Sequence, residues 1–149
     1  LCQKKSVYFI GRGADYAAAI EGSLKLKEVS YLASEGYPAG ELKHGTLALV
    51  GEDAPVVALL SDARLAEKTM NAVHEVRSRG ARVFLITTLS SYAEGVLPEE
   101  DVLLLPACEA VFSPLCTVVP LQFLAYETAV LLGHDPDKPR NLAKSVTVE

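Results

Sequence analysis

The stretch SVYFIGRG, residues 6–13, decides the fold of this chain. Its first part, SVYFIG, is a short run rich in strand-forming residues that ends at Gly11, which predicts a buried strand. Beyond the glycine turn, Asp15 can cap a helix that we expect to run to about Ala33. A buried strand followed directly by a helix is typical of an α/β protein.

The alternation of strands and helices continues along the chain. The later segments are a strand in APVVALLS (54–61), a helix from Ala63 to about Arg79, strands in ARVFLITT (81–88) and DVLLLP (101–106), and a helix in TVVPLQFLAYETAVLLG (117–133). Continuous apolar strands separated by helices predict a mainly parallel sheet covered on both faces, which is a three-layer α/β/α sandwich. We assign residues 1–133 to this domain and 134–149, which lacks clear periodicity, to a C-terminal tail.

The composition is that of one globular domain, and its net negative charge does not favour binding to polyanions. The chain has 149 residues, of which 50% are hydrophobic and 22% charged, and this excludes a disordered protein. Its 14 Lys and Arg against 19 Asp and Glu give a net charge of −5, and no basic run is present. We therefore expect neither nucleic acid nor a membrane as a partner.

Cysteine usage and hydropathy favour a cytoplasmic protein. Three cysteines without a CxxC pair indicate a reducing compartment and no metal site. No signal peptide opens the chain. The most apolar stretch, VVPLQFLAYETAVLLG (118–133), is interrupted by Pro120 and Glu127, so we predict a buried helix that is too short to span a bilayer.

The first helix carries a narrow charged stripe. Glu21, Lys25 and Glu28 fall within about 60° of one another on a helical projection. Apolar faces flank this stripe on both sides, a broad one made by Ala19, Gly22, Leu26, Val29 and Ala33 and a narrow one made by Ile20, Leu24 and Tyr31. The stripe is either an ion-pair ladder on an exposed helix or a carboxylate and an amine half-buried at an interface, where both pKa values would move into a catalytic range.

Two further segments have both a structural and a catalytic interpretation. GELKHG, residues 40–45, is either a charged surface loop or a turn that presents His44 at the carboxyl ends of the strands, where open α/β sheets bind ligands. We expect this loop to follow the striped helix directly. The tail with Lys144 is either a frayed terminus or an ordered segment, because NLAKSVTV is too apolar for a tail that stays in water.

Four motifs together resemble one enzyme family. GRG (11–13), EGSLKLKEVSY (21–31), AGELKHG (39–45) and PRNLAKSVTVE (139–149) are similar, in the same order, to the C-terminal isomerase region of the glutamine–fructose-6-phosphate aminotransferases, also called glucosamine-6-phosphate synthases. The resemblance extends from about Val7 to Glu149 and therefore covers nearly the whole chain.

The resemblance implies a fold and an activity. The family's isomerase region has two sugar-isomerase (SIS) subdomains of flavodoxin-like α/β/α architecture, and this chain looks like the second subdomain with its C-terminal tail. The implied reaction converts fructose 6-phosphate and ammonia, which an absent glutaminase domain would release from glutamine, into glucosamine 6-phosphate. The resemblance also implies a reaction without cofactor or metal. The narrow polar strip between two apolar faces predicts a homodimer, with the striped helix or the GELKHG loop near the contact, because a monomer would leave these faces partly exposed.

The resemblance assigns four catalytic residues. His44 matches the histidine that opens the sugar ring and reaches into the neighbouring subunit's site, and Glu28 matches the base that moves a proton between C1 and C2. Lys25 matches the lysine that assists at the sugar hydroxyls, and Lys144 matches the lysine that forms a Schiff base with the ketose carbonyl. Lys25, Glu28 and Lys144 would also bind the substrate. These side chains suit the chemistry, since imidazole exchanges protons near neutrality and a desolvated amine is a nucleophile.

One segment departs from what a complete sugar-phosphate enzyme needs. The family's first subdomain binds the phosphate with a Ser/Thr-rich loop, whereas the comparable segment here, LLSDARLAEKT (59–69), offers only Ser61 near the turn, with Asp62 beside it. We therefore expect this chain to be inactive alone. The alternatives are a non-catalytic sugar-phosphate-binding SIS module and a free-standing phosphosugar isomerase.

Overall fold

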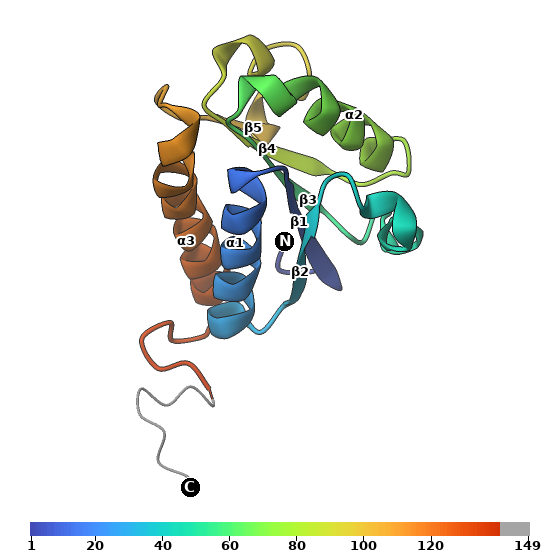
Figure 1. The fold of residues 1–149 in the computed structure, drawn as a ribbon. Helices are drawn as coiled ribbons and strands as arrows, with labels where there is room; N and C mark the ends of the chain where they lie inside the picture. The colour runs from blue at the N-terminus through green and yellow to red at the C-terminus, as the bar shows by residue number, and fades with distance from the viewer. Residues whose placement is uncertain (141–149) are drawn as a thin grey trace, which may run out of the picture.

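The computed structural model describes residues 1–140, which form one parallel sheet with helices on both sides (Figure 1). The strands are β1 (Ser6–Gly11), β2 (Ala33–Pro38), β3 (Val56–Leu60), β4 (Val83–Thr87) and β5 (Val102–Leu104). The α-helices are α1 (Ala14–Ser30), α2 (Ala66–Arg77) and α3 (Ser113–Leu131). The strand order is β2-β1-β3-β4-β5 and every neighbouring pair is parallel, so the predicted sheet is confirmed.

Side chains that alternate along the strands build a separate hydrophobic core on each face of the sheet. One core joins Phe9 of β1 to Leu26 of α1 and Leu121 of α3. The other joins Ile10, the next residue of β1, to Val73 of α2. Helices α1 and α3 therefore cover one face and α2 covers the other, as the three-layer sandwich requires (Figure 1).

The prediction for the first helix was wrong at its end, because α1 stops at Ser30 and an unpredicted strand, β2, begins at Ala33. Tyr31 adopts a left-handed backbone conformation (φ 62°), and its N–H donates to the carbonyl oxygen of Lys27 at 3.2 Å, which closes the helix. Strand β2 has the sequence ASEGYP and only Ser34 is fully buried in it. An edge strand with so little apolar burial carries no alternating pattern, and this is why the sequence did not reveal it.

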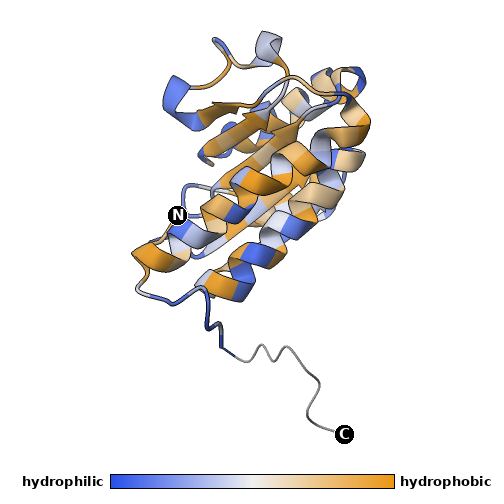
Figure 2. Ribbon diagram, turned by 90° about the vertical axis from the view of Figure 1, so that its left-hand side faces the viewer, coloured by the Kyte–Doolittle hydropathy of each residue, from blue (hydrophilic) through white to orange (hydrophobic). Residues whose placement is uncertain are grey.

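Helix α3 is longer and less buried than predicted. With the 3₁₀ turn before it, it forms a 22-residue apolar helix over Ala110–Leu131, which by length and composition alone is long enough to cross a membrane. One side packs on α1 and the sheet through Leu121 and Ala125. Figure 2, which faces this helix, shows hydrophobic residues on its outward side as well. The large exposed side chains of this outward side are Val111, Phe112, Leu115, Val119, Phe123, Tyr126, Val130 and Leu131.

The prediction that Asp15 caps α1 was wrong. The residue before the helix is Gly13, which makes no side-chain capping hydrogen bond, and Asp15 lies within the first turn. Its buried carboxylate instead accepts hydrogen bonds from the backbone N–H of Ser61, at 2.8 Å, and from the Ser61 hydroxyl. The side chain therefore ties the start of α1 to the end of β3.

The predicted site residues lie at opposite edges of the parallel sheet. The strands end at one edge, at Gly11, Pro38, Leu60 and Thr87. Because α1 connects the end of β1 to the start of β2, its last turns lie at the opposite edge. The chain passes from β1 outward to β2 and then to β3 on the other side of β1, so β1 and β3 flank the topological switch point of the sheet.

Candidate functional site

The charged stripe of α1 forms the expected ion pairs, and they are half-buried. The amine of Lys25 lies 2.6 Å from Glu28 Oε2 and 3.7 Å from Glu21 Oε1. The side chains of Lys25 and Glu28 are 31% and 26% exposed, so they are neither in the core nor fully in solvent. The hydrogen bond from Lys25 to Glu28 raises the pKa of the amine, which is opposite to the shift expected for a catalytic base. Lys25 is therefore an ammonium donor in this arrangement.

A cavity of about 240 Å³ opens beside this pair. Lys25 and Val29 of α1 line one wall, and α3 contributes the wall opposite them. Pro136 and Asp137, from the segment that follows α3, close a third side. The cavity is thus built by two helices and the beginning of the predicted tail, and the amine of Lys25 belongs to its lining.

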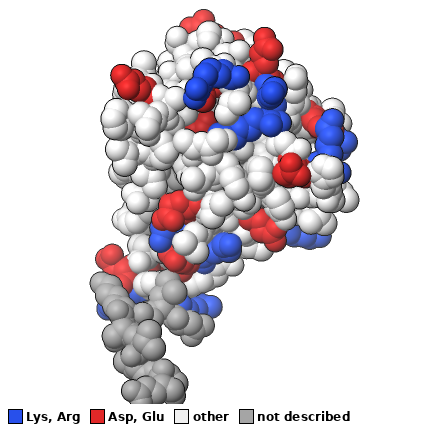
Figure 3. Space-filling view, viewed as in Figure 1, with Lys and Arg blue, Asp and Glu red and all other residues white. Residues whose placement is uncertain are grey.

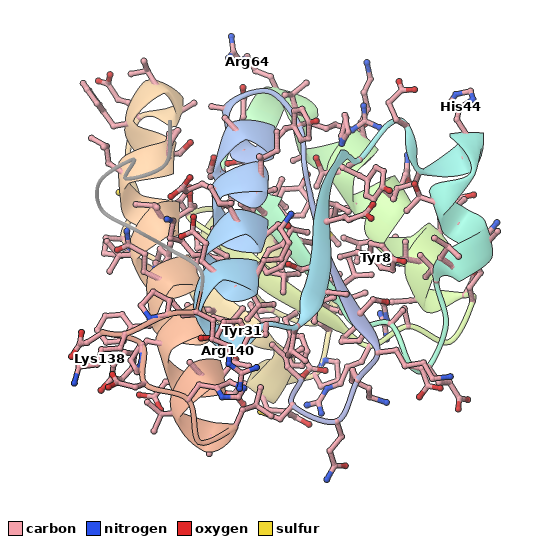
Figure 4. All side chains as sticks on the ribbon, turned by 90° about the horizontal axis from the view of Figure 1, so that it is seen from below. Tyr8, Tyr31, His44, Arg64, Lys138 and Arg140 are labelled. Atoms are coloured by element: carbon pink, nitrogen blue, oxygen red, sulfur yellow. The ribbon has the colours of Figure 1, made fainter. Side chains whose placement is uncertain are left out.

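The segment after α3 is attached to the end of α1 by Tyr31. The backbone N–H of Arg140 donates to the Tyr31 hydroxyl at 2.8 Å, and the Arg140 guanidinium lies 4.7 Å from the centre of the Tyr31 ring. The His134 ring lies 4.7 Å from the same ring. Figure 4 shows Tyr31 and Arg140 next to one another at the end of α1. Neither residue was predicted as part of the site, since their contact joins positions 109 residues apart and leaves no local pattern.

Lys144, the predicted Schiff-base lysine, lies outside the described residues, as do the other residues from 141 to 149. The structure therefore describes only the approach to it. That approach, residues 134–140, packs at the end of α1 that carries Lys25 and Glu28.

The prediction that the GELKHG loop follows the striped helix directly was wrong, because β2 comes between them. The loop continues from the carboxyl end of β2, and it contains the 3₁₀ turn η1 (Leu42–His44). The His44 side chain is 75% exposed and its Nε2 lies 3.7 Å from Glu41 Oε2 (Figure 4). Its position at the carboxyl edge of the sheet agrees with the prediction.

Within one chain His44 is far from the pair on α1. Strand β2, Ala33–Pro38, carries the chain across the sheet at about 3.3 Å per residue, so the loop lies roughly 20 Å from the last turns of α1. Lys25 and Glu28 are therefore brought together by the fold, and His44 is not brought to them.

Near the topological switch point, the donors of Ser61 at the end of β3 are not free to bind a phosphate. These two donors, the backbone N–H and the hydroxyl, are taken by the Asp15 carboxylate, which is 3% exposed. Burial raises the pKa of Asp15, although the hydrogen bonds from Ser61 oppose this shift. The sequence indicated that Ser61 is a poor phosphate ligand, and the structure supplies a cause, because the Asp15 carboxylate already accepts from both of its donors.

A larger cavity, of about 620 Å³, lies away from the predicted residues. It is formed mainly by apolar side chains of β4, β5 and α3, among them Phe84 and Phe123, and Leu1 lies at it. Figure 3 shows acidic and basic side chains mixed on the face that it displays, without a continuous basic surface. None of Lys25, Glu28 and His44 lines this cavity.

Comparison with known proteins places these features in a family. The family model described as SIS domain matches residues 1–132. The chain is 54% identical over 146 residues to the glutamine--fructose-6-phosphate aminotransferase [isomerizing] of Caldanaerobacter subterraneus, and covers 97% of its own length and 24% of that protein. It is 50% identical over 149 residues to the Thermus thermophilus protein of the same name, again covering 24% of the relative and 99% of itself.

A solved structure shares both sequence and fold with this chain. The C-terminal domain of glucosamine-fructose-6-phosphate aminotransferase from Francisella tularensis superposes with a TM-score of 0.86 at 40% identity, over 92% of this chain and 38% of that one. The chain thus spans about a quarter of the length of the curated relatives it matches. It is a homologue of these aminotransferases, and it belongs to the SIS-domain family.

Proposed function

We propose that this chain is the second SIS subdomain, with the C-terminal tail, of a glucosamine-6-phosphate synthase. In this role it contributes to the conversion of fructose 6-phosphate and ammonia into glucosamine 6-phosphate. The observation that carries the proposal is the half-buried pair of Lys25 and Glu28, beside a cavity whose third wall is the segment leading to Lys144. The names of the relatives, which are about 50% identical over the whole chain, support the same reaction.

The proposed chemistry divides between these side chains. The Lys144 amine attacks the ketose carbonyl and water leaves, which gives an imine, and ammonia then displaces the lysine. The Glu28 carboxylate carries the proton between C1 and C2. Lys25, held as an ammonium by its hydrogen bond to Glu28, donates to the sugar hydroxyls.

The position of His44 supports a homodimer. Because His44 lies roughly 20 Å from the pair in its own chain, it can act on the sugar ring only in the site of a second copy. Ile20 and Leu24, on the narrow apolar face beside the stripe, are 45% and 40% exposed, and a contact between copies would bury them.

The occupied donors of Ser61 favour this proposal over its two alternatives. A free-standing phosphosugar isomerase and a sugar-phosphate-binding module would each need a phosphate site of their own. The Asp15 carboxylate occupies the Ser61 donors that such a site would use. We therefore propose that the phosphate is held by another part of a longer protein, and that the 149-residue chain does not turn over fructose 6-phosphate alone. The three free cysteines fit a cytoplasmic location.

A trapping experiment in the longer natural protein tests the assignment of Lys144. Borohydride reduction in the presence of fructose 6-phosphate is expected to leave a sugar adduct that peptide mapping finds on Lys144. Lys144→Ala should abolish both the adduct and synthase activity, while Lys138→Ala, an exposed lysine of the same segment, should retain both. An unchanged adduct in Lys144→Ala would show that the assignment is wrong, and robust turnover by the 149-residue chain would favour the free-standing isomerase.

A further inference from the structure

The GRG motif, residues 11–13, is one of the four family motifs, but the proposed function gives it no role. The backbone explains its two glycines. A Cβ at Gly11 would lie 2.6 Å from the carbonyl carbon and oxygen of Asp15, and Gly13 has a φ of 58° just before α1. Arg12, between the glycines, has no such backbone reason, so the reason for an arginine has to come from its side chain.

The Arg12 guanidinium lies against Gly40, the first residue of the GELKHG loop. The three atoms nearest to a Cβ built at Gly40 are Nη1, Nη2 and Cζ of Arg12, at 2.9, 3.2 and 3.3 Å. Gly40 has no positive φ, so glycine is needed there for the room that it leaves and not for its backbone conformation. The two family motifs GRG and AGELKHG therefore meet in the fold, although they are distant in the sequence.

A second contact fixes the start of the loop on the GRG turn. The N–H of Ala39 donates to the carbonyl oxygen of Gly11 at 2.8 Å, and Ala39 is buried. The Nε atom of Arg12 is buried and makes no hydrogen bond within residues 1–140, so packing around it holds this side chain in place. A hydrogen bond on one residue and a guanidinium on the next thus hold the entry of the loop.

Residues 40–44 form one continuous run of short turns. The N–H of Glu41 donates to the carbonyl oxygen of Pro38 at 2.8 Å, and the N–H of His44 donates to that of Glu41 at 3.0 Å. None of these residues has a positive φ, and Leu42 is fully buried in the core that α2 covers. The run can therefore turn as a unit about Leu42, and the contacts at its start fix its direction.

We infer that Arg12 is a positioning residue, which fixes the start of the GELKHG loop on the end of β1 and so sets the direction in which His44 leaves the domain. The His44 side chain is 75% exposed, and Figure 4 shows it pointing away from the sheet. Because the proposed role of His44 is in the site of a second copy, a small rotation at its base displaces the imidazole from the sugar ring. The inference rests on the proposed function for this consequence, but the contact itself can be measured without activity.

Arg12→Ala in the longer natural protein tests the contact, with Arg64→Ala as the matched control. Arg64 lies at the same edge of the sheet but pairs with Asp62 beside it, at 2.7 Å. Amide hydrogen exchange in residues 41–44 is expected to accelerate on the order of fivefold or more in Arg12→Ala, with exchange in the sheet unchanged. Arg64→Ala should leave exchange in the loop unchanged.

Gly40→Ala tests the same contact from the other side. Its Cβ would displace the end of the Arg12 side chain, so it should also accelerate exchange in the loop. In the Arg12→Ala background the displaced atoms are gone, and Gly40→Ala should then have little further effect. Full additivity of the two changes would show that Arg12 and Gly40 do not act through one contact.

Kinetics distinguish the positioning of His44 from general structural damage. In Arg12→Ala, synthase kcat should fall on the order of tenfold while KM for fructose 6-phosphate stays within about twofold. His44→Ala should retain measurable activity, because sugar rings also open spontaneously in water. In this background Arg12→Ala should have no further effect on kcat, since the group that it positions is absent.

Unchanged exchange in Arg12→Ala would overturn the inference, and so would an effect on kcat that persists in full in the His44→Ala background. If His44→Ala by itself leaves kcat unchanged, the proposed role of His44 fails, whereas the exchange measurement still decides whether Arg12 holds the loop.

Discussion

Replacing Gly36 by alanine is expected to destabilise the domain, because β2 approaches α1 too closely there for a side chain. A Cβ at Gly36 would lie 2.9 Å from Ile20 Cα, 3.0 Å from Ile20 N and 3.2 Å from Ala19 C, all of them backbone atoms of α1. Ordinary contacts begin near 3.4 Å, so α1 would have to withdraw by about 0.5 Å.

The other side of α1 opposes this movement. A Cβ at Gly22 of the same helix would already lie 2.9 Å from Leu121 Cδ1 of α3, so α1 is closely packed from both sides. Overpacking of this kind costs about 1–3 kcal/mol, and we expect the upper half of this range. Alanine offsets ~0.4–1 kcal/mol of this cost, because it lowers the conformational entropy of the unfolded chain relative to glycine. A net loss of about 2 kcal/mol corresponds to a decrease in Tm of about 4–8 °C for a chain of this size.

Urea unfolding followed by circular dichroism would measure this loss, with Gly51→Ala as the control. The nearest atom to a Cβ at Gly51 is Arg79 O at 3.9 Å, so this variant should change the free energy of unfolding by less than about 1 kcal/mol. If Gly36→Ala and Gly51→Ala unfold at the same urea concentration, the close contact between β2 and α1 is not a source of stability.

Two further predictions concern Asp15 and the proposed dimer. Burial raises the folded-state pKa of Asp15 above its ordinary value of 3.8, so the folded state binds more protons at this residue than the unfolded state does. The contribution of Asp15 to the free energy of unfolding therefore declines as pH rises from about 3.8 through the raised pKa. Asp15→Asn should remove this decline, which urea unfolding at pH 4 and pH 7 would detect, and the same pH dependence in both proteins would contradict it. The Leu24 side chain beside the stripe is 40% exposed, and Leu24→Asp replaces it with a charged one. This variant should weaken self-association in sedimentation velocity without changing the circular dichroism spectrum. An unchanged mass at high concentration would exclude this face from the dimer contact.

The sequence alone determined those parts of the fold that depend on local pattern. Strands β1, β3, β4 and β5 are continuous apolar runs, and their alternation with helices predicted the parallel three-layer sandwich that the structure has. The pairing of Lys25 with Glu28 was also predictable, because residues three apart on a helix are always neighbours. The four family motifs identified the homology for the same reason, since a motif is local.

Tertiary structure alone decided the features that depend on contacts between distant segments. Strand β2 is polar and exists because β1 supplies its hydrogen-bonding partners. Asp15 binds Ser61 across 46 residues, and Tyr31 binds Arg140 across 109. The outward side of α3 stays exposed because the described residues offer no layer beyond it, although its composition is that of a buried helix. In each case the stabilising free energy comes from contacts between groups that are distant in the sequence and that form only when the chain folds. Residue periodicity reports on local structure, so it carries no information about these contacts.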